Sequence, residues 1–443
     1  MNKNNTVIVI GAGPVGLAAA AHLIAQKLNP IVLEKGKHAG HAVSQWGHVK
    51  LFSPWKYVFD KQVLTLLDRT DWLAPENDGL PTGKSIVDDY LTPASKTAEL
   101  ASAIRYNSEV IAISKQGHAK SSSTNRSDAR YSVHVRTGNG DINIMHAHAV
   151  IDASGTWGYP NPIGLDGLPV PGEIENKSSI VYGIENALGQ AQSLYAGKHT
   201  LVLGGGHSAI NVALDLLTLQ QQYPATKITW GLRTNKLEKL LGGGINDELP
   251  ARGKLGLAAK EAVDKEQLSL LAPFEITRIV KAAVKLKITA IIENSTSTFH
   301  VDRIIVAAGF RPNLDMLREL RLSIDDIVEA PKELAPLIDP NLHSCGSVPP
   351  HGFSELSHPD DNFFIVGMKA YGRAPTFLML TGYEQVRSIA AKLAGDLESA
   401  KRVELVLPKT GVCSSKKGTT SSSETATSTC CSSSITTTPS CCS

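Results

Sequence analysis

A strand, a glycine turn, a helix and a second strand follow one another without interruption between residues 7 and 34. The first four residues are β-branched and apolar, which is typical of a strand buried on both faces. Gly11, Gly13 and Gly16 come next, followed by an alanine-rich helical run and a second apolar run that ends on Glu34. This order and spacing are typical of a βαβ unit whose first turn approaches a phosphate.

Each part of this turn has a physical role. Gly11 allows the tight turn, Gly13 lets the backbone approach a pyrophosphate, and Gly16 lets the helix pack on the strand. The helix, which begins near Pro14, presents free N–H groups and its positive dipole end to the phosphates. Glu34, which lies 23 residues after Gly11, is placed to accept hydrogen bonds from a ribose diol. These five residues predict a dinucleotide site.

The whole chain has the composition of a globular protein of two or three domains. It has 443 residues, of which 42% are hydrophobic and 19% charged, and its net charge of +2 gives no reason to expect a nucleic-acid partner. Glycines and a proline break the longest apolar stretch, residues 7–25, so it does not predict a membrane span. Cleavage there as a signal peptide would destroy the βαβ pattern. We therefore expect a cytoplasmic protein that does not contact a membrane.

The cysteines are concentrated at the C-terminal end. Only Cys345 lies in the body of the chain, and residues 1–408 contain no CxxC pair, which argues against dithiol chemistry. Ser and Thr supply 20 of the last 35 residues, so this segment cannot bury enough apolar surface to become ordered. Residues 409–443 are therefore expected to form a disordered tail. The cysteines of the tail are Cys413, Cys430, Cys431, Cys441 and Cys442.

The opening pattern recurs between residues 200 and 233. An apolar strand at 200–203 leads into a glycine turn with alanine in the third place, and a helix follows at 210–220. The second strand, residues 227–232, ends on Arg233 rather than on an acid. We therefore predict a second dinucleotide site. Its predicted contacts are Gly204, Gly206, His207, Ser208, Ala209 and Arg233.

The arginine distinguishes the second site from the first. An acidic residue at this position binds a free 2′-hydroxyl and repels a 2′-phosphate, whereas a guanidinium forms paired, charge-assisted hydrogen bonds to the phosphate. Arg233 therefore favours NADPH over NADH. Arg252, in the glycine-rich loop that follows, either reinforces the phosphate site or is solvated.

Patterns elsewhere predict the remaining elements. A segment rich in proline and glycine, residues 159–172, marks the clearest domain boundary. The polar segment 114–130 is expected to lack regular structure. Further expectations are a helical segment at 81–103, strands at 107–113, 131–136, 149–155 and 363–367, short strands within 267–309, and a helix at about 376–394.

A long loop after the first motif, residues 35–59, is rich in histidine, tryptophan and glycine and has no clear periodicity. Two interpretations remain open for Gly40, His41, Trp46 and Trp55. They either help to wall a ligand pocket or fill a core beneath the loop.

The two motifs, with the second nested inside the first domain, resemble those of the two-dinucleotide-binding flavoproteins. Within that class the chain looks most similar to the flavin-containing monooxygenases and related NADPH-dependent flavoproteins. The resemblance covers about residues 5–400. The sequences that carry it are GAGPVG with Glu34, DASG at 152–155, GGGHSA with Arg233, and AAGFRPN at 307–313. The loop chemistry and the cysteine-rich end also look similar to flavoproteins encoded beside bacterial arsenic-resistance genes.

The resemblance implies an α/β fold with two Rossmann-like domains. An NADPH-binding domain, residues 166–312, would be inserted into a discontinuous FAD-binding domain formed by residues 1–165 and 313–408. FAD and NADPH are the implied cofactors. Further implied cofactor contacts are Val110, Ser154, Gly155 and Gly367.

The sequence departs from the group at two places. The fingerprint between the two motifs contains a histidine in the group, and the matching segment here, residues 180–184, lacks it. This puts a typical Baeyer–Villiger or amine-oxygenating site in doubt. Related reductases carry an aspartate after the last glycine of the FAD domain, whereas here Gly367 precedes Met368.

The favoured activity is that of an NADPH-driven flavin monooxygenase. One oxygen atom from O₂ would pass to a soft nucleophilic small molecule at a nitrogen, sulfur or metalloid centre, and the protein would orient the flavin and exclude water. The expected catalytic residues are Trp46 and Tyr371, packed on the flavin, and Lys369 and Arg373, which would stabilise negative charge.

Two other functions remain open. One is an NAD(P)H-dependent flavin reductase or oxidase that inserts no oxygen. The other is a metal- or metalloid-binding protein in which the paired thiolates of the tail are the ligands, because thiolates suit soft ions such as Cu(I) or As(III). The oxygenated substrate and the oligomeric state do not follow from the sequence.

Overall fold

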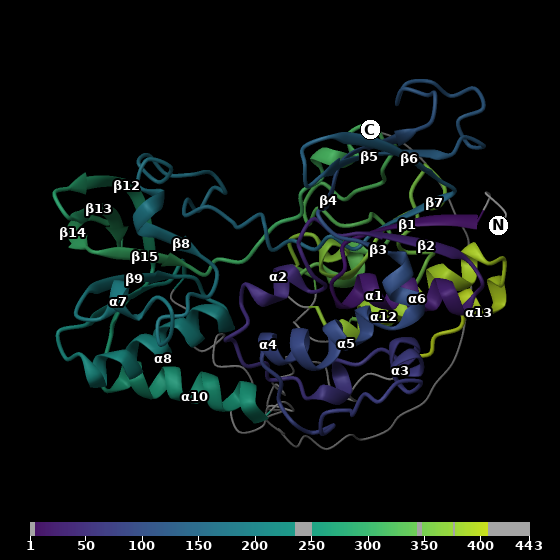
Figure 1. The fold of residues 1–443 in the computed structure, drawn as a ribbon. Helices are drawn as coiled ribbons and strands as arrows, with labels where there is room; N and C mark the ends of the chain where they lie inside the picture. Colours follow the sequence, from purple (N-terminus) through teal and green to yellow (C-terminus); the bar gives the residue numbers. More distant parts are fainter. Residues whose placement is uncertain (1–4, 235–249, 343–347, 375–376, 406–443) are drawn as a thin grey trace, which may run out of the picture.

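The computed structural model describes residues 5–234, 250–342, 348–374 and 377–405. The predicted cysteine tail and Cys345 lie outside these residues. The hypothesis that the thiolates of the tail bind a metal or metalloid therefore concerns residues that the structure does not describe. Two lobes stand side by side, joined by a pair of extended linkers (Figure 1). The larger lobe contains both ends of the described chain.

The larger lobe is built on a parallel sheet with the order β16-β7-β1-β2-β3. Its strands are β1 (Thr6–Ile10), β2 (Asn29–Leu33), β3 (Ile104–Arg105), β7 (Ala149–Asp152) and β16 (Phe363–Ile365). Because β1 pairs in register with β2 and β7, Leu33, Ile10 and Asp152 lie side by side at the carboxyl edge of the sheet. That edge is where parallel α/β sheets bind ligands.

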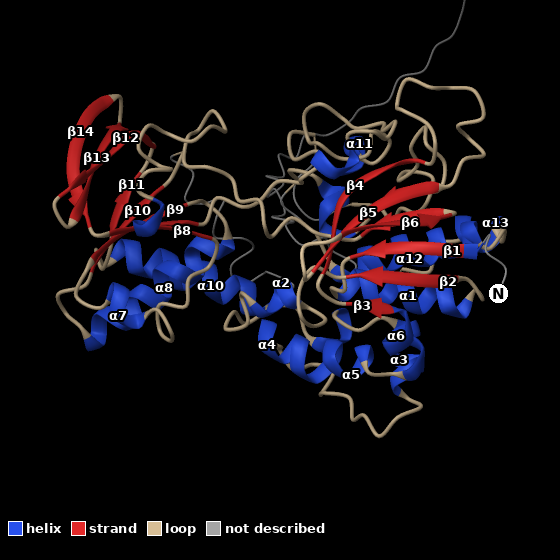
Figure 2. Ribbon diagram, turned by 45° about the horizontal axis from the view of Figure 1, so that its top comes forward, coloured by secondary structure: helices blue, strands red, loops and turns tan. Residues whose placement is uncertain are grey.

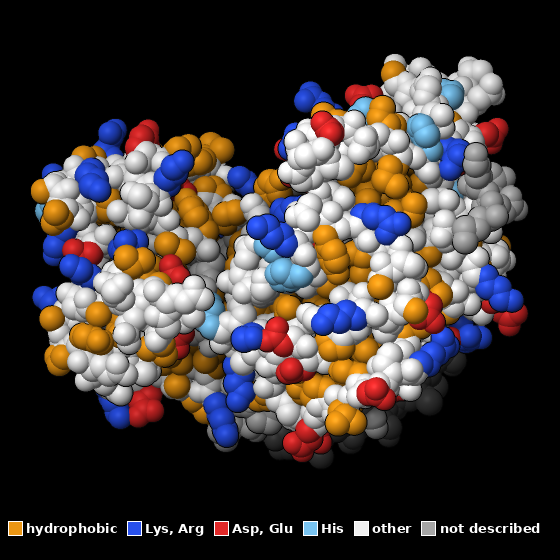
Figure 3. Space-filling model, in the orientation of Figure 1, with side chains coloured by type: hydrophobic (Ala, Val, Ile, Leu, Met, Phe, Trp, Pro, Cys, Tyr) orange, Lys and Arg blue, Asp and Glu red, His pale blue; other side chains and the backbone are white. Residues whose placement is uncertain are grey.

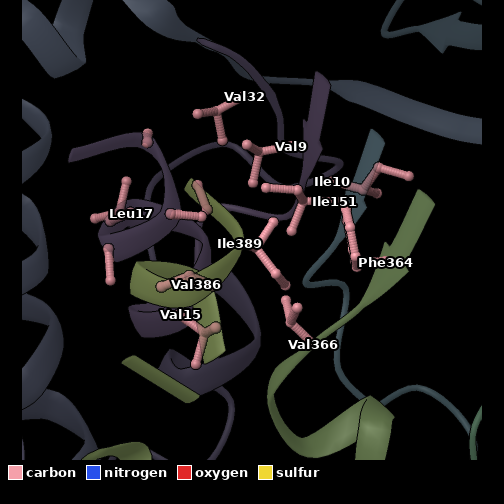
Figure 4. Packing of buried hydrophobic residues seen from close by; sticks show 14 of the residues in the cluster. Val9, Ile10, Val15, Leu17, Val32, Ile151, Phe364, Val366, Val386 and Ile389 are labelled. Atoms are coloured by element: carbon pink, nitrogen blue, oxygen red, sulfur yellow. The ribbon is translucent and has the colours of Figure 1, made fainter. Parts of the chain in front are cut away.

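Helices α1 (Pro14–Ala25) and α12 (Met379–Leu393) pack together beneath this sheet (Figure 2). Their contact explains how the C-terminal part of the chain completes a domain begun by the N-terminal part. Apolar side chains from β1, α1, β2, β7, β16 and α12 pack against one another in this core (Figure 4). Examples are Val9, Leu17, Val32, Ile151, Phe364, Val386 and Ile389.

Short helices and an antiparallel meander complete the larger lobe. The meander consists of β4 (Ser108–Lys115), β5 (Tyr131–Thr137) and β6 (Ile142–Ala147). The short helices are α2 (His41–Ser44), η2 (Trp55–Tyr57), α3 (Lys61–Leu67), α4 (Gly83–Ser85), the π-helix η3 (Ile86–Leu91), α5 (Thr92–Ser95), α6 (Ala98–Ala103), η6 (Asp315–Leu317), α11 (Ala335–Ile338), η7 (Gly367–Tyr371) and α13 (Leu397–Lys401).

The smaller lobe repeats the design. Its parallel sheet has the order β11-β10-β9-β15-β8, with helices on one face and a three-stranded antiparallel sheet on the other (Figure 1). The parallel strands are β8 (Ile180–Tyr182), β9 (His199–Leu203), β10 (Lys227–Gly231), β11 (Ser269–Leu271) and β15 (Arg303–Val306). The other elements are η4 (Lys177–Ser179), α7 (Gln192–Tyr195), α8 (His207–Gln222), α10 (Pro250–Asp264), β12 (Phe274–Ala282), β13 (Lys285–Ile292) and β14 (Ser295–Val301).

This topology confirms the expected insertion, because the chain leaves the first sheet after β7 and returns to it only at β16. Between the lobes the two linkers pair with each other. Asn161 N–H donates to Gly309 O over 3.0 Å, and Arg311 N–H donates to Tyr159 O over 2.9 Å. The exact domain boundaries proposed from the sequence stay predictions.

Most elements lie where the sequence patterns placed them. The segment 81–103 is largely helical, the strands near 107, 131 and 363 are present, and the late helix is α12. Strand β4 runs on to Lys115, two residues into the segment 114–130, and residues 116–130 contain no helix or strand, as expected. The segment is nevertheless firmly anchored. Arg126 is 3% exposed and binds Asp360 through two hydrogen bonds of 2.6 and 2.8 Å.

Lys and Arg are interspersed with Asp and Glu over the face shown in Figure 3. Among the described residues, no helix combines the length and the apolar character needed to traverse a bilayer.

Candidate functional site

The first glycine turn is shaped to receive a phosphate. Gly11 has φ of +97° and its N–H donates to Leu33 O over 2.8 Å, which closes the turn against β2. A Cβ on Gly16 would lie 1.9 Å from Gly11 O, so only glycine lets α1 approach this closely. At Gly13 an added Cβ would meet nothing within 4 Å, because the backbone here faces open cavity. Helix α1 begins at Pro14 without a side-chain cap, so its first N–H groups point to any anion held there.

Glu34 lies at the end of β2 and is 7% exposed. Its carboxylate accepts hydrogen bonds from the N–H groups of Ala12 and Gly36, each over 2.7 Å. A carboxylate has about four acceptor positions, so capacity remains for a ribose diol. The residue lines the cavity, in the position expected for a ribose contact.

A buried ion pair supports the turn after β7. Lys369 Nζ lies 2.6 Å from Asp152 Oδ2, and the two side chains are 2% and 0% exposed. Lys369 also donates to Ser154 Oγ over 3.1 Å, and Ser154 in turn donates to Asp152 Oδ1 over 2.6 Å. The next residue, Gly155, has φ of +68° and faces open cavity. The ion pair therefore fixes the backbone of a predicted cofactor contact from behind.

A second polar chain holds the turn after β16. Gly367 N–H donates to Gln385 Oε1 over 2.8 Å, and the Gln385 amide nitrogen lies 2.9 Å from His351 Nε2. Because an amide nitrogen only donates, His351 accepts at Nε2 and carries its proton on Nδ1, which lies 3.1 Å from Pro349 O. Burial lowers the pKa of His351, which favours the neutral imidazole.

The second glycine turn has the same construction. A Cβ on Gly204 would lie 2.3 Å from Ala307 O, and one on Gly206 would meet nothing within 4 Å. Helix α8 begins at His207 without a side-chain cap. The fully buried Trp230 donates its indole N–H to Gly204 O over 2.9 Å, which holds the turn in place. The turn is thus open to a phosphate in the same way as the first.

Arg233 and Arg252 both line the cavity in the smaller lobe. Arg233 follows the end of β10 and is exposed, whereas Arg252, on α10, is 3% exposed. The structure thus brings the two arginines considered in the sequence into one cavity. Their contact with a 2′-phosphate stays a proposal.

The two turns open into one cavity of about 1570 Å³ that spans both lobes and the linkers. Val110, Gly40, His41 and Trp46 also line it. Trp55 is 5% exposed and packs in the core instead, with its ring stacked on Phe59 at 5.0 Å. In the loop 35–59, Gly40, His41 and Trp46 therefore line the cavity, whereas Trp55 packs in the core beneath the loop.

The four residues proposed as catalytic occupy different settings. Trp46 lines the cavity 6.4 Å from Trp157, and Lys369 lines it with its charge paired to Asp152. Arg373 also lines it, but its guanidinium is bound to Glu329 by two hydrogen bonds of 2.8 and 3.2 Å. Tyr371 is 2% exposed and is not part of the cavity wall formed by the described residues.

Sequence reasoning missed the supporting residues. Asp152, Gln385 and His351 hold the cofactor turns from behind, and Trp157 lies between the lobes with its ring 4.7 Å from that of Phe310. Asp152 begins the recognised DASG motif, which was the one signal available. Gln385 and His351 carry none, because their role depends on contacts between distant segments.

The fold and the paired phosphate turns define a two-dinucleotide-binding oxidoreductase. The chain belongs to the pyridine nucleotide-disulphide oxidoreductase family, whose sequence pattern matches residues 8–344. This confirms the expected class of protein and its two Rossmann-like domains.

Two curated relatives illustrate the range of the family. The nitric oxide reductase FlRd-NAD(+) reductase of Vibrio vulnificus is 24% identical over 197 residues, which are 44% of this chain and 45% of the relative. The chain therefore spans about half the length of that relative. A putative flavin-containing monooxygenase 2 of Arabidopsis thaliana is 25% identical over 393 residues, covering 80% of this chain and 82% of the relative.

Solved structures share the fold. The bacillithiol disulfide reductase Bdr of Bacillus cereus aligns with a TM-score of 0.65 and 19% identity, covering 88% of this chain and 99% of the other. The FAD-bound cadaverine monooxygenase DfoA of Erwinia amylovora aligns with a TM-score of 0.58 and 14% identity, covering 92% of this chain and 99% of the other. At such identities the likeness shows the fold alone.

The residues present fit the two cofactors of the class. The first turn offers an uncapped helix N-terminus and a buried carboxylate, and the second offers an uncapped helix N-terminus and arginines. FAD and NADPH are the cofactors of this oxidoreductase.

Proposed function

We propose that the protein is an FAD-dependent NADPH monooxygenase that inserts one atom of O₂ into a soft nucleophilic small molecule. The observation that carries this proposal is the single cavity onto which both glycine turns open, with apolar and aromatic side chains between them. Residues 1–408 contain no CxxC pair that could take electrons from the flavin by dithiol exchange. The Arabidopsis relative, which matches over most of its length, is named a monooxygenase.

The reaction balances with the components named. NADPH and a proton supply two electrons and two hydrogens, one oxygen atom joins the substrate's lone pair, and the other leaves as water. FAD, when bound, accepts the hydride and passes the electrons on to O₂. The chain positions the two cofactors and keeps bulk water from the reacting atoms.

Named residues perform these tasks. Glu34 and the turn from Gly11 to Gly16 would hold the adenosine and pyrophosphate of FAD. Gly204, Gly206 and the arginines would hold NADPH. Trp46 lies on the cavity wall, where its indole excludes water. Lys369 acts through Asp152 and Ser154 as a positioning residue, since its charge is already paired.

Isotope labelling tests the proposal. The NADPH-reduced holoenzyme is mixed with ¹⁸O₂ and thioanisole, and product, peroxide and NADPH consumption are measured together. We expect sulfoxide carrying one ¹⁸O atom for each NADPH consumed, and a transient absorbance between those of reduced and oxidised flavin. Recovery of all reducing equivalents as hydrogen peroxide, with no such transient, would refute oxygen insertion.

A flavin reductase or oxidase is the second candidate, because the Vibrio relative is named a reductase. In that case electrons would pass to an external acceptor, and addition of a quinone or ferredoxin would raise NADPH turnover without labelled product. The specific link to arsenic resistance, the cytoplasmic location and the metalloid substrate stay predictions.

A further inference from the structure

Part of the cavity belongs to neither glycine turn, and we call it the apolar wall. Its side chains come from the segment between α2 and α3 and from the residues at and just before the start of α12. They are Trp46, Leu51, Phe52, Val58, Phe377 and Met379. The two segments meet at Tyr383, whose hydroxyl donates to Val58 O over 2.5 Å and lies 3.8 Å from Met379 Sδ.

The apolar wall reaches the second glycine turn. The ring of Phe52 lies 5.4 Å from that of His207, the first residue of α8. Trp46 lies on the other side, toward the linker residue Trp157. The apolar wall therefore runs from the FAD-binding lobe to the second glycine turn, between the two cofactor positions.

The cations beside the apolar wall are already neutralised. Lys369 is paired with Asp152 at 2.6 Å, and Arg373 is paired with Glu329 at 2.8 Å. Glu34 accepts two backbone hydrogen bonds and is assigned to FAD.

The other charged side chains of the cavity lie at its margin or in the smaller lobe. Glu109 is paired with Arg136 at 2.8 Å, and Arg252 is buried on α10 in the smaller lobe. The exposed ones are Lys35, Lys50, Asp166, Arg233 and Asp315. Within the described residues, the apolar wall therefore has no buried, unpaired charge of its own.

This pattern of charges selects among substrates. A charged group that leaves water for an apolar surface loses its hydration, and this cost is recovered only by a partner of opposite charge. An uncharged molecule pays no such cost and gains from the removal of its apolar surface from water.

We propose that the substrate is an uncharged soft nucleophile with an apolar body, such as a thioether or an organic trivalent metalloid, and that charged amines, amino acids and carboxylates are rejected by the apolar wall. The inference rests on the proposed function for its reaction, but the binding preference can be measured without turnover.

Three matched thioethers test the preference. Thioanisole, 4-(methylthio)benzoate and 4-(methylthio)benzylamine share one body and differ in charge at neutral pH. Binding to the oxidised holoenzyme is followed by perturbation of the flavin spectrum and by tryptophan fluorescence. We expect thioanisole to bind on the order of tenfold or more tightly than either charged analogue. Equal or tighter binding of a charged analogue would overturn the inference.

A pair of variants locates the selectivity. Leu51→Asp places a carboxylate on the apolar wall, so affinity for the benzylamine should rise and affinity for thioanisole fall. Leu51→Asn, of similar size but neutral, should weaken thioanisole without favouring the amine. Lys50→Gln removes the neighbouring exposed charge and should leave the order unchanged. If Lys50→Gln reversed the order of affinities for the three thioethers, the selectivity would belong to the exposed charges at the cavity margin and not to the apolar wall.

Turnover separates this inference from the proposed function. The expected binding order without any sulfoxide would leave the apolar wall assigned and the monooxygenase activity refuted. Sulfoxide formed equally well from all three thioethers would support the monooxygenase activity and refute the selectivity of the apolar wall. Because the wild-type protein alone gives both readouts, a variant that fails to fold does not remove the test.

Discussion

At the scale of single residues, we propose that the placement of charge selects between NADPH and NADH in the smaller lobe. Arg233 is exposed at the end of β10 and lines the cavity, so its guanidinium is available to a 2′-phosphate at little cost in desolvation. Its position follows from the strand, because the carboxyl end of β10 lies beside the second glycine turn. The buried Arg252 lines the same cavity.

Arg233→Ser should raise KM for NADPH and leave KM for NADH nearly unchanged. A hydrogen bond to a charged group contributes about 1.5–3 kcal/mol, which corresponds to roughly 10- to 100-fold. Steady-state kinetics with both nucleotides measures the ratio. Lys227→Ser, at the opposite end of β10, is the matched control and should not change it. An equal loss with both nucleotides would show that Arg233 does not read the 2′-phosphate.

At the scale of elements, local sequence patterns predicted the helices and strands well, but they did not predict the contacts between distant segments. The βαβ units follow from glycine spacing and β-branched runs, which act within a few tens of residues. The ion pairs Lys369–Asp152 and Arg126–Asp360 join positions 217 and 234 residues apart. No sequence pattern indicates such partners. Lys369 was therefore expected to stabilise negative charge in the active site, whereas in the structure its ammonium group is paired with Asp152.

The segment between η6 and β16 carries a titration that couples to folding. His358 is 6% exposed, accepts a hydrogen bond at Nδ1 from Ser323 N–H over 3.3 Å, and packs 5.8 Å from the ring of Phe363. Burial lowers the pKa of His358 from 6.5 to about 4. His358 is therefore protonated more readily in the unfolded chain than in the folded protein.

The sign of the pH dependence follows from that difference. Above pH 6.5 His358 is neutral in both states and the free energy of unfolding is unaffected, and between 6.5 and about 4 it falls as the pH falls. The full loss from this group is roughly 3 kcal/mol at 1.36 kcal/mol per pKa unit. Urea denaturation from pH 7.5 to 4.5 should show a shallower slope for His358→Asn, whose amide oxygen can replace Nδ1 as acceptor. An unchanged slope would contradict this assignment.

At the scale of the whole molecule, the two cofactors are expected to contact different sets of chain segments. FAD would touch the ends of β1, β2, β7 and β16, which come from both halves of the sequence, whereas NADPH would touch only the inserted lobe. A ligand that binds only the folded form stabilises what it contacts, by about 2.7 kcal/mol at 100 times its Kd. The discontinuous lobe should therefore depend on FAD for its integrity, and the inserted lobe should not.

Hydrogen exchange measured by mass spectrometry can resolve this division. Adding FAD to the apoprotein should slow exchange at residues 7–17, 150–155 and 363–371 together, because one ligand closes all three segments. Adding NADP⁺ to the holoenzyme should slow exchange at residues 203–212 and leave the first turn unchanged. The apolar wall is the informative exception, because Phe52 contacts His207 across the lobes and residues 50–53 should respond to NADP⁺. Slower exchange at the Gly11 turn on addition of NADP⁺ alone would show that the two glycine turns are not separate binding sites.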